Sequence, residues 1–165
     1  MDKFQHPIIL CPYKLKFSSP ELFGRHLALK SQLTVQVENE DGFKINFEHP
    51  KATYKTKLKF SSTSNIPQLK YELLLDDFKL FFYEDFIEIL FKLKVDYYHL
   101  QDLYKRDDLQ EIEFLKVLFE LLKTLGVKEI YFGIFEEFGN GKQFKYKWKN
   151  VLREISGLTH FQSSF

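Results

Sequence analysis

The chain has 165 residues, of which 44% are apolar and 28% are charged, and its formal net charge is +1. This length and composition predict one globular domain, 1–165, and exclude a chain that is disordered throughout. The chain does not start with a basic segment before a long apolar stretch, and no apolar run reaches the roughly 18–20 residues of a membrane span. We therefore expect a cytoplasmic protein that makes no contact with a membrane.

The first part of the chain, 1–83, contains all five prolines and is predicted to be rich in strands. Ser18-Ser19-Pro20-Glu21 predicts the start of a short helix that runs to about Lys30, with a serine cap and an early proline. Asn39 to Gly42 predicts the turn of a hairpin. Alternation of apolar and polar residues predicts strands over 8–17, 33–38, 43–47, 54–60, 69–75 and 78–83.

The second part, 84–165, is predicted to be rich in helices. One helix should begin at Glu84-Asp85, because apolar residues follow it at helical spacing. A longer one should cover 109–125, with a cap at Asp108 and an end at Gly126. The helix 109–125 is apolar around most of its circumference, so we expect it to be the buried central helix. The alternative is that it forms the interface of a homo-oligomer.

A hairpin is predicted over about 128–149, because Asn140-Gly141 separates a strand over 128–135 from an alternating segment over 144–149. A short helix over 150–156 and a frayed tail over 163–165 should follow. The fold class is therefore α+β. A mainly antiparallel sheet of about 5–7 strands packs on the helix 109–125 and on shorter helices. The 19 phenylalanines should face inward and close one shared interior.

Motifs for chemistry are missing from the sequence. It contains no phosphate-binding glycine loop and no nucleophile elbow, and its five histidines are widely separated. The single cysteine, Cys11, lies among apolar residues and is predicted to be a small core residue. We expect no catalytic residue, no metal and no cofactor.

Charge is unevenly distributed along the chain. Residues 1–70 carry +5, residues 71–140 carry −8 and residues 141–165 carry +4. Lysines recur at every second position of three expected strands, which predicts a basic sheet face, and acidic residues occur in adjacent pairs. The candidate binding residues are Lys55, Lys57, Lys59, Lys145, Lys147 and Lys149 on the lysine faces, with Asp76, Asp77, Glu136 and Glu137 from the acidic pairs.

These features favour a non-catalytic module of the cytoplasm that binds another protein through charged surfaces, as an inhibitor, an immunity-type protein or an assembly protein does. One alternative is a nucleic-acid binder that uses the lysine face, although only three of the 24 cations are arginine and the neighbouring aromatic residues should face inward. The other alternative is an enzyme whose site is dispersed along the chain and has no motif.

Overall fold

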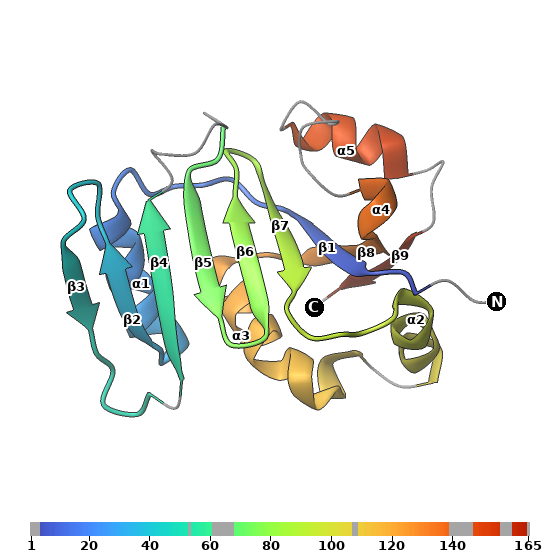
Figure 1. The fold of residues 1–165 in the computed structure, drawn as a ribbon, viewed down its shortest axis with the longest axis horizontal. Helices are drawn as coiled ribbons and strands as arrows, with labels where there is room; N and C mark the ends of the chain where they lie inside the picture. Colours follow the sequence, from blue (N-terminus) through green and yellow to red (C-terminus); the bar gives the residue numbers. More distant parts are fainter. Residues whose placement is uncertain are drawn as a thin grey trace.

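The computed structural model describes residues 4–52, 54–60, 68–106, 109–138, 147–155 and 160–164. Its strands form one nine-stranded sheet in the order β3-β2-β4-β5-β6-β7-β1-β8-β9 (Figure 1). The strands are β1 (Pro7–Pro12), β2 (Thr34–Glu38), β3 (Lys44–Phe47), β4 (Lys55–Phe60), β5 (Tyr71–Leu75), β6 (Phe78–Phe82), β7 (Phe86–Phe91), β8 (Glu129–Ile134) and β9 (His160–Ser164). The helices are α1 (Pro20–Ser31), α2 (Tyr97–Arg106), α3 (Lys116–Leu125), α4 (Phe135–Phe138) and α5 (Trp148–Ile155), with 3₁₀ turns η1 (Leu109–Glu111) and η2 (Glu113–Leu115). The predicted α+β class is confirmed.

Neighbouring strands run antiparallel, apart from the parallel pair β2 and β4. The predicted hairpin of β2 and β3 is confirmed. The Asn39 side chain accepts the backbone N–H groups of Asp41 and Phe43 in its turn. Gly42 has φ +82°, a value that glycine adopts more readily than other residues. The first strand of the chain, β1, lies in the sheet between β7 and β8.

Helix α1 begins and ends close to its predicted bounds. The Ser19 hydroxyl accepts the N–H of Leu22 at 3.2 Å, and Pro20 stands in the first turn, where its missing N–H costs nothing. Gly24 brings the helix close to β2, because a Cβ at this position would lie 2.2 Å from Cγ2 of Val37. The sequence therefore sets both the start of α1 and its close approach to the sheet.

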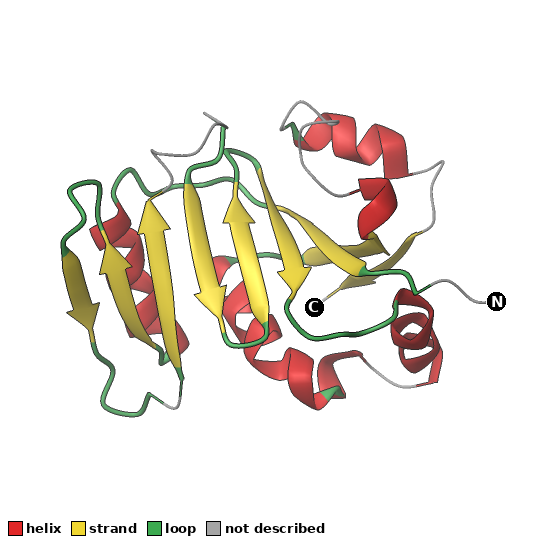
Figure 2. Ribbon diagram, viewed as in Figure 1, coloured by secondary structure: helices red, strands yellow, loops and turns green. Residues whose placement is uncertain are grey.

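The sheet buries apolar side chains on both faces, which corrects the prediction of one shared interior. Helices α1 and α3 cover one face and enclose the larger cluster, which includes Phe23, Leu58 and Phe82 (Figure 2). A smaller cluster lies on the other face, where Val151 and Ile155 of α5 pack with the residues of β1 and β7. In the described part of the chain, no helix covers the portion of this second face that β2, β3 and β4 form (Figure 2).

The helix predicted from Glu84-Asp85 is wrong, since Phe86–Phe91 is the strand β7. Its side chains enter both clusters: Ile87 and Ile89 lie in the larger one, and Phe86 lies in the smaller one. A strand buried on both faces is a nearly continuous apolar run and lacks the alternation of a half-buried strand. This strand and β9 bring the sheet to nine strands, above the predicted 5–7.

The helix predicted over 109–125 is shorter than expected and is not central. Two 3₁₀ turns, η1 and η2, occupy the first part, and the regular helix α3 covers only Lys116–Leu125. Ile112 separates the two turns with an extended backbone, at φ −72° and ψ 118°. The end at Gly126 is confirmed by its φ of +89°. The expected cap at Asp108 lies outside the described residues.

The first strand of the hairpin predicted over 128–149 is confirmed as β8. Trp148 and Lys149 belong to the helix α5, so this part of the expected second strand is wrong, while its turn at 139–141 lies outside the described residues. The partner of β8 on this side is β9, in which Phe161 is opposite Phe132. The tail was expected to be frayed, yet its residues Ser163 and Ser164 pair with β8.

Candidate functional site

Three of the predicted binding lysines lie on β4 as expected. Lys55, Lys57 and Lys59 are exposed, and Thr56 and Leu58 between them are buried. The predicted alternation is therefore correct for this strand. The lysines point away from the side that α1 and α3 cover, because alternate residues of a strand face opposite sides of a sheet.

The neighbouring strands place glutamates beside one of these lysines. Lys59 is opposite Glu38 of β2 and Glu72 of β5. Glu38 is also opposite Lys44 of β3. Glu72 forms an ion pair with Lys79 of β6, with 2.9 Å between the amine nitrogen and the carboxylate oxygen. Directly opposed residues on one face have Cβ atoms about 4.5–5.5 Å apart, which is close enough for attraction. This row of alternating charges makes the face mixed in sign rather than basic.

A shallow polar hollow of about 150 Å³ lies at the other end of the same face, around Lys55 and Lys57. Gln36 of β2 donates to Asn46 of β3 at 3.3 Å beside it. Its walls are Thr34, Gln36, Asn46, Glu48, Lys55, Thr56 and Lys57. Among the described residues that line this hollow none is aromatic, so they offer no surface on which nucleic-acid bases stack.

The predicted lysine faces do not join. Lys14 and Lys16 follow β1, and three strands separate β1 from β4 in the sheet. Lys147 precedes α5 and Lys149 lies within it, on an element outside the sheet. Lys145 lies outside the described residues. The described lysines therefore form separate groups rather than one basic surface.

Asp76 and Asp77, in contrast, line a groove. They form the turn between β5 and β6, which lies beside α3 in Figure 1. The groove has a volume of about 210 Å³, and Glu113 adds a third carboxylate. We call it the acidic groove, and its walls are Tyr54, Leu75, Asp76, Asp77, Phe78, Glu113, Phe114 and Val117. Five apolar or aromatic side chains thus stand beside three acidic ones.

The carboxylates of the acidic groove differ in their partners. Glu113 is paired with Lys116 at 3.1 Å, and the Glu113 side chain is well exposed. The turn that contains the two aspartates is hydrogen-bonded to the residue that follows β7, because the carbonyl oxygen of Asp77 accepts the N–H of Lys92 at 2.8 Å. Within the described residues, no ion pair or hydrogen bond engages the side chain of Asp76 or Asp77. Two uncompensated negative charges therefore face the groove.

A second hollow of about 70 Å³ adjoins the acidic groove, since Tyr54 and Val117 line both. Glu120 of α3 adds a further carboxylate in this hollow. Ser31, the last residue of α1, also lines it, and its hydroxyl oxygen is buried with no hydrogen-bond partner among the described residues. A buried hydroxyl without a partner costs free energy in the folded state.

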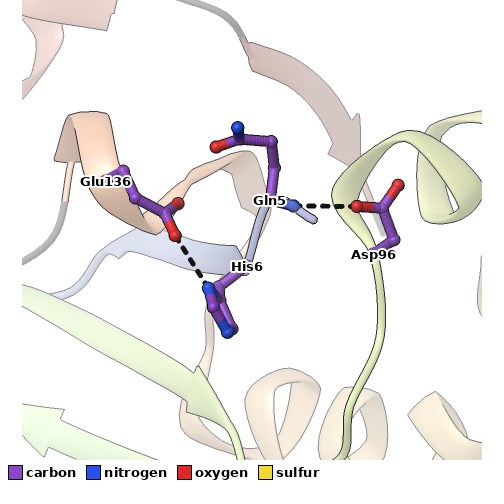
Figure 3. Close-up of polar contacts among 4 residues, drawn as sticks. All are labelled: Gln5, His6, Asp96 and Glu136. Carbon is purple, nitrogen blue, oxygen red and sulfur yellow. Dashed lines mark hydrogen bonds and ion pairs between the residues drawn. The ribbon is translucent and has the colours of Figure 1, made fainter. Parts of the chain in front are cut away.

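The acidic pair of α4 does not form a joint surface. Glu136 is exposed, and its carboxylate accepts a hydrogen bond from Nδ1 of His6 at 2.7 Å (Figure 3). Glu137 is half-buried. Burial of Glu136 raises the pKa of its carboxyl, but the hydrogen bond from the His6 side chain, the backbone hydrogen bonds and the charge of His6 together outweigh this effect, so that the pKa is lowered. The sequence did not suggest this pairing, because 130 residues separate the partners.

The residue before this histidine is anchored to another element. The Gln5 N–H donates to the Asp96 carboxylate at 2.9 Å (Figure 3), and the Gln5 carbonyl accepts the N–H of Tyr97 at 2.8 Å. Tyr97 itself is fully buried, and its hydroxyl has no hydrogen-bond partner among the described residues. Burial raises the pKa of that hydroxyl well above its usual value. The two hydrogen bonds of the Gln5 backbone hold the segment that carries His6, and in this way they position the His6–Glu136 pair.

A His–carboxylate pair can orient an imidazole for acid–base chemistry. Neither His6 nor Glu136 lines any of the three hollows described above, and both side chains are well exposed. Among the described residues, no group of three or more His, Cys, Asp or Glu side chains could hold a metal ion. Cys11 is fully buried, and this burial raises the pKa of its thiol. Among the hollows and clusters of the described residues, we therefore take the acidic groove as the candidate site, because it joins carboxylates to an apolar wall.

Comparison with protein-family models, with curated proteins and with solved structures finds no match to this chain. In the described part of the chain, no helix is both long and apolar enough to cross a bilayer. The candidate site therefore has to be judged on its own geometry.

Reasoning from the sequence identified two residues of the acidic groove, Asp76 and Asp77, and missed the rest. Phe114 and Val117 were assigned to a helix buried on several sides. In the structure both are half-buried and line the groove. The excess of apolar residues in 109–125 was the available signal, because it exceeds what one face packed on the sheet requires.

Proposed function

We propose that the chain is a non-catalytic protein-binding module and that the acidic groove is its recognition surface. The observation that carries the proposal is the placement of Asp76 and Asp77, two carboxylates without a partner, at the edge of a concave surface with an apolar wall. Clefts of this kind, in which a few polar groups stand over apolar side chains, are where ligands bind most often.

The dimensions of the groove favour a protein ligand over a small molecule. Pockets for small molecules and cofactors usually measure about 300–1,000 Å³. The acidic groove measures about 210 Å³, and the adjoining hollow about 70 Å³. This space suits one or two side chains of a partner. An inhibitor or an assembly protein would use it as the anchor point of a larger interface.

Site-specific cross-linking tests the proposal. A photoreactive phenylalanine analogue at Tyr54, which is 40% exposed in the wall of the groove, should capture a defined partner in cell extract. The same analogue at the exposed Leu152 of α5 serves as the control and should not capture it. Equal capture at both positions would contradict the proposal.

The nucleic-acid alternative is less well supported. Glu38 and Glu72 flank Lys59, and the described lysine groups lie apart. A gel-shift titration with single-stranded DNA and RNA at low salt tests it. Binding through the lysines of β4 should fall steeply as the salt concentration rises and should be lost in the variant K55A/K57A.

A further inference from the structure

We infer that the acidic groove takes a lysine or arginine side chain from an extended basic segment of the partner protein. This inference rests on the proposed function and specifies the chemistry of its ligand. Asp76 and Asp77 supply negative charge that nothing in the described chain neutralises. Complementary potentials across an interface set its specificity and its rate of association.

The apolar wall of the groove matches the shape of such a side chain. Lysine and arginine carry a charged head on an apolar stem, and they bury the stem against apolar surface. The rings of Tyr54 and Phe114 and the methyl groups of Val117 provide that surface next to the aspartates. A cation placed over the face of an aromatic ring gains further stabilisation.

The adjoining hollow extends the binding surface beyond the aspartates. It shares Tyr54 and Val117 with the acidic groove, so an extended segment bound in the groove can continue into it. Glu120 gives the same hollow a negative charge, so a second basic residue of the segment is also favoured there.

Alternative occupants fit the groove less well. An acidic segment would meet Asp76, Asp77 and Glu113 with like charge, which costs several kcal/mol at an interface. A purely apolar segment would cover the aspartates without pairing with them, and a buried unpaired charge is strongly unfavourable. A basic segment satisfies both the apolar wall and the charges.

Fluorescence anisotropy with labelled synthetic peptides tests the inference. The probe is a flexible glycine–serine peptide that carries lysines. The comparison peptides carry norleucine, which has a similar stem without the charge, or glutamate in place of lysine. The lysine peptide should bind, and the other two should bind more weakly by about tenfold or more, because a charge-assisted hydrogen bond is lost.

The variant D76N/D77N should weaken binding of the lysine peptide by a similar factor of about ten. The variant D102N/E154Q removes the same formal charge at exposed positions of α2 and α5, outside the groove, and should bind like the unaltered protein. Circular dichroism confirms that both variants are folded.

The inference would be overturned by equal binding of the norleucine and lysine peptides, or by equal loss of binding in the two double variants. Failure of the lysine peptide to bind even at low salt would overturn it as well. The proposed function fails separately, when the photoreactive group at Tyr54 captures no defined partner. Capture at Tyr54 that persists in D76N/D77N would leave the binding module standing and refute the basic ligand.

Discussion

The carboxylate of Asp85 accepts the backbone N–H of Trp148, with its two oxygens 3.1 and 3.2 Å from that nitrogen. Asp85 precedes β7, and Trp148 is the first residue of α5, so this contact caps the helix from a distant part of the chain. A negative charge at the start of a helix satisfies a free N–H and complements the helix dipole. It therefore holds α5 on the smaller apolar cluster.

Asp85→Ala should loosen α5 and lower stability by about 1 kcal/mol, the usual cost of a lost helix cap. Trp148 is the only tryptophan of the chain and packs against Phe86 and Tyr131, so its fluorescence reports the docking of α5. We expect its emission to shift to the red at low urea, before the whole protein unfolds. Asp76→Ala is the control, and an unchanged emission curve for Asp85→Ala would exclude the capping role.

Gly24→Ala should destabilise the protein, because the new Cβ would lie 2.2 Å from Cγ2 of the buried Val37. Alanine improves helix propensity by up to about 1 kcal/mol, but overpacking costs about 1–3 kcal/mol, so a net loss is expected. Urea unfolding measures it. Val37→Ala makes room for the methyl group, so the double variant should lose less stability than the sum of the two single variants. Strict additivity would show that the two residues do not collide.

Tyr97→Phe should leave stability unchanged or raise it by about 1 kcal/mol, because it removes a buried hydroxyl that has no hydrogen-bond partner. Tyr71→Phe is the matched comparison. The Tyr71 hydroxyl donates to the carbonyl oxygen of Phe17 at 3.2 Å, so its loss should cost about 1 kcal/mol. Thermal unfolding of the two variants measures the contrast. An equal loss of stability in the two variants would mean that the Tyr97 hydroxyl is hydrogen-bonded in solution.

The His6–Glu136 pair should stabilise the protein in a pH-dependent way. Since the pair lowers the folded-state pKa of Glu136, its contribution is complete above the usual glutamate value of about 4.3. It is lost as the pH falls through the lowered folded value. His6→Ala should raise the pKa of the Glu136 carboxyl, as followed by NMR titration. A titration curve that does not move on substitution would exclude the hydrogen bond in solution.

Strand β4, which has one buried face, was predictable from the sequence, and strand β7, which is buried on both faces, was not. Lys57 and Leu58 of β4 alternate in exposure as their chemistry indicates. In β7, Ile87 and Ile89 face one apolar cluster while Phe86 and Leu90 face the other, so no polar residue marks a face except the buried Glu88. Such a run can be mistaken for a helix, because its apolar residues occur at every second position, as in a strand, and also at every third or fourth position, as in a helix.

The candidate site was only partly predictable for a different reason. Asp76 and Asp77 form a local turn and could be identified as exposed acids. Their significance depends on Tyr54 and Phe114, which only the fold brings to the same groove. The sequence does not show which strands are neighbours in the sheet, so it could not show which charges lie beside the lysines. Glu72 stands next to Lys59 because β5 pairs with β4, and spacing along the chain carries no such information.

The place of β1 between β7 and β8 also bears on how the protein is made. The apolar segment Pro7–Pro12 leaves the ribosome before both of its partners, because 86–91 and 129–134 come much later in the chain. At about 5–20 residues per second, the wait for β7 alone lasts on the order of 4–16 s. Throughout that time an apolar strand with both edges open is exposed to other nascent chains, so the yield of native protein should depend on chaperones that shield it.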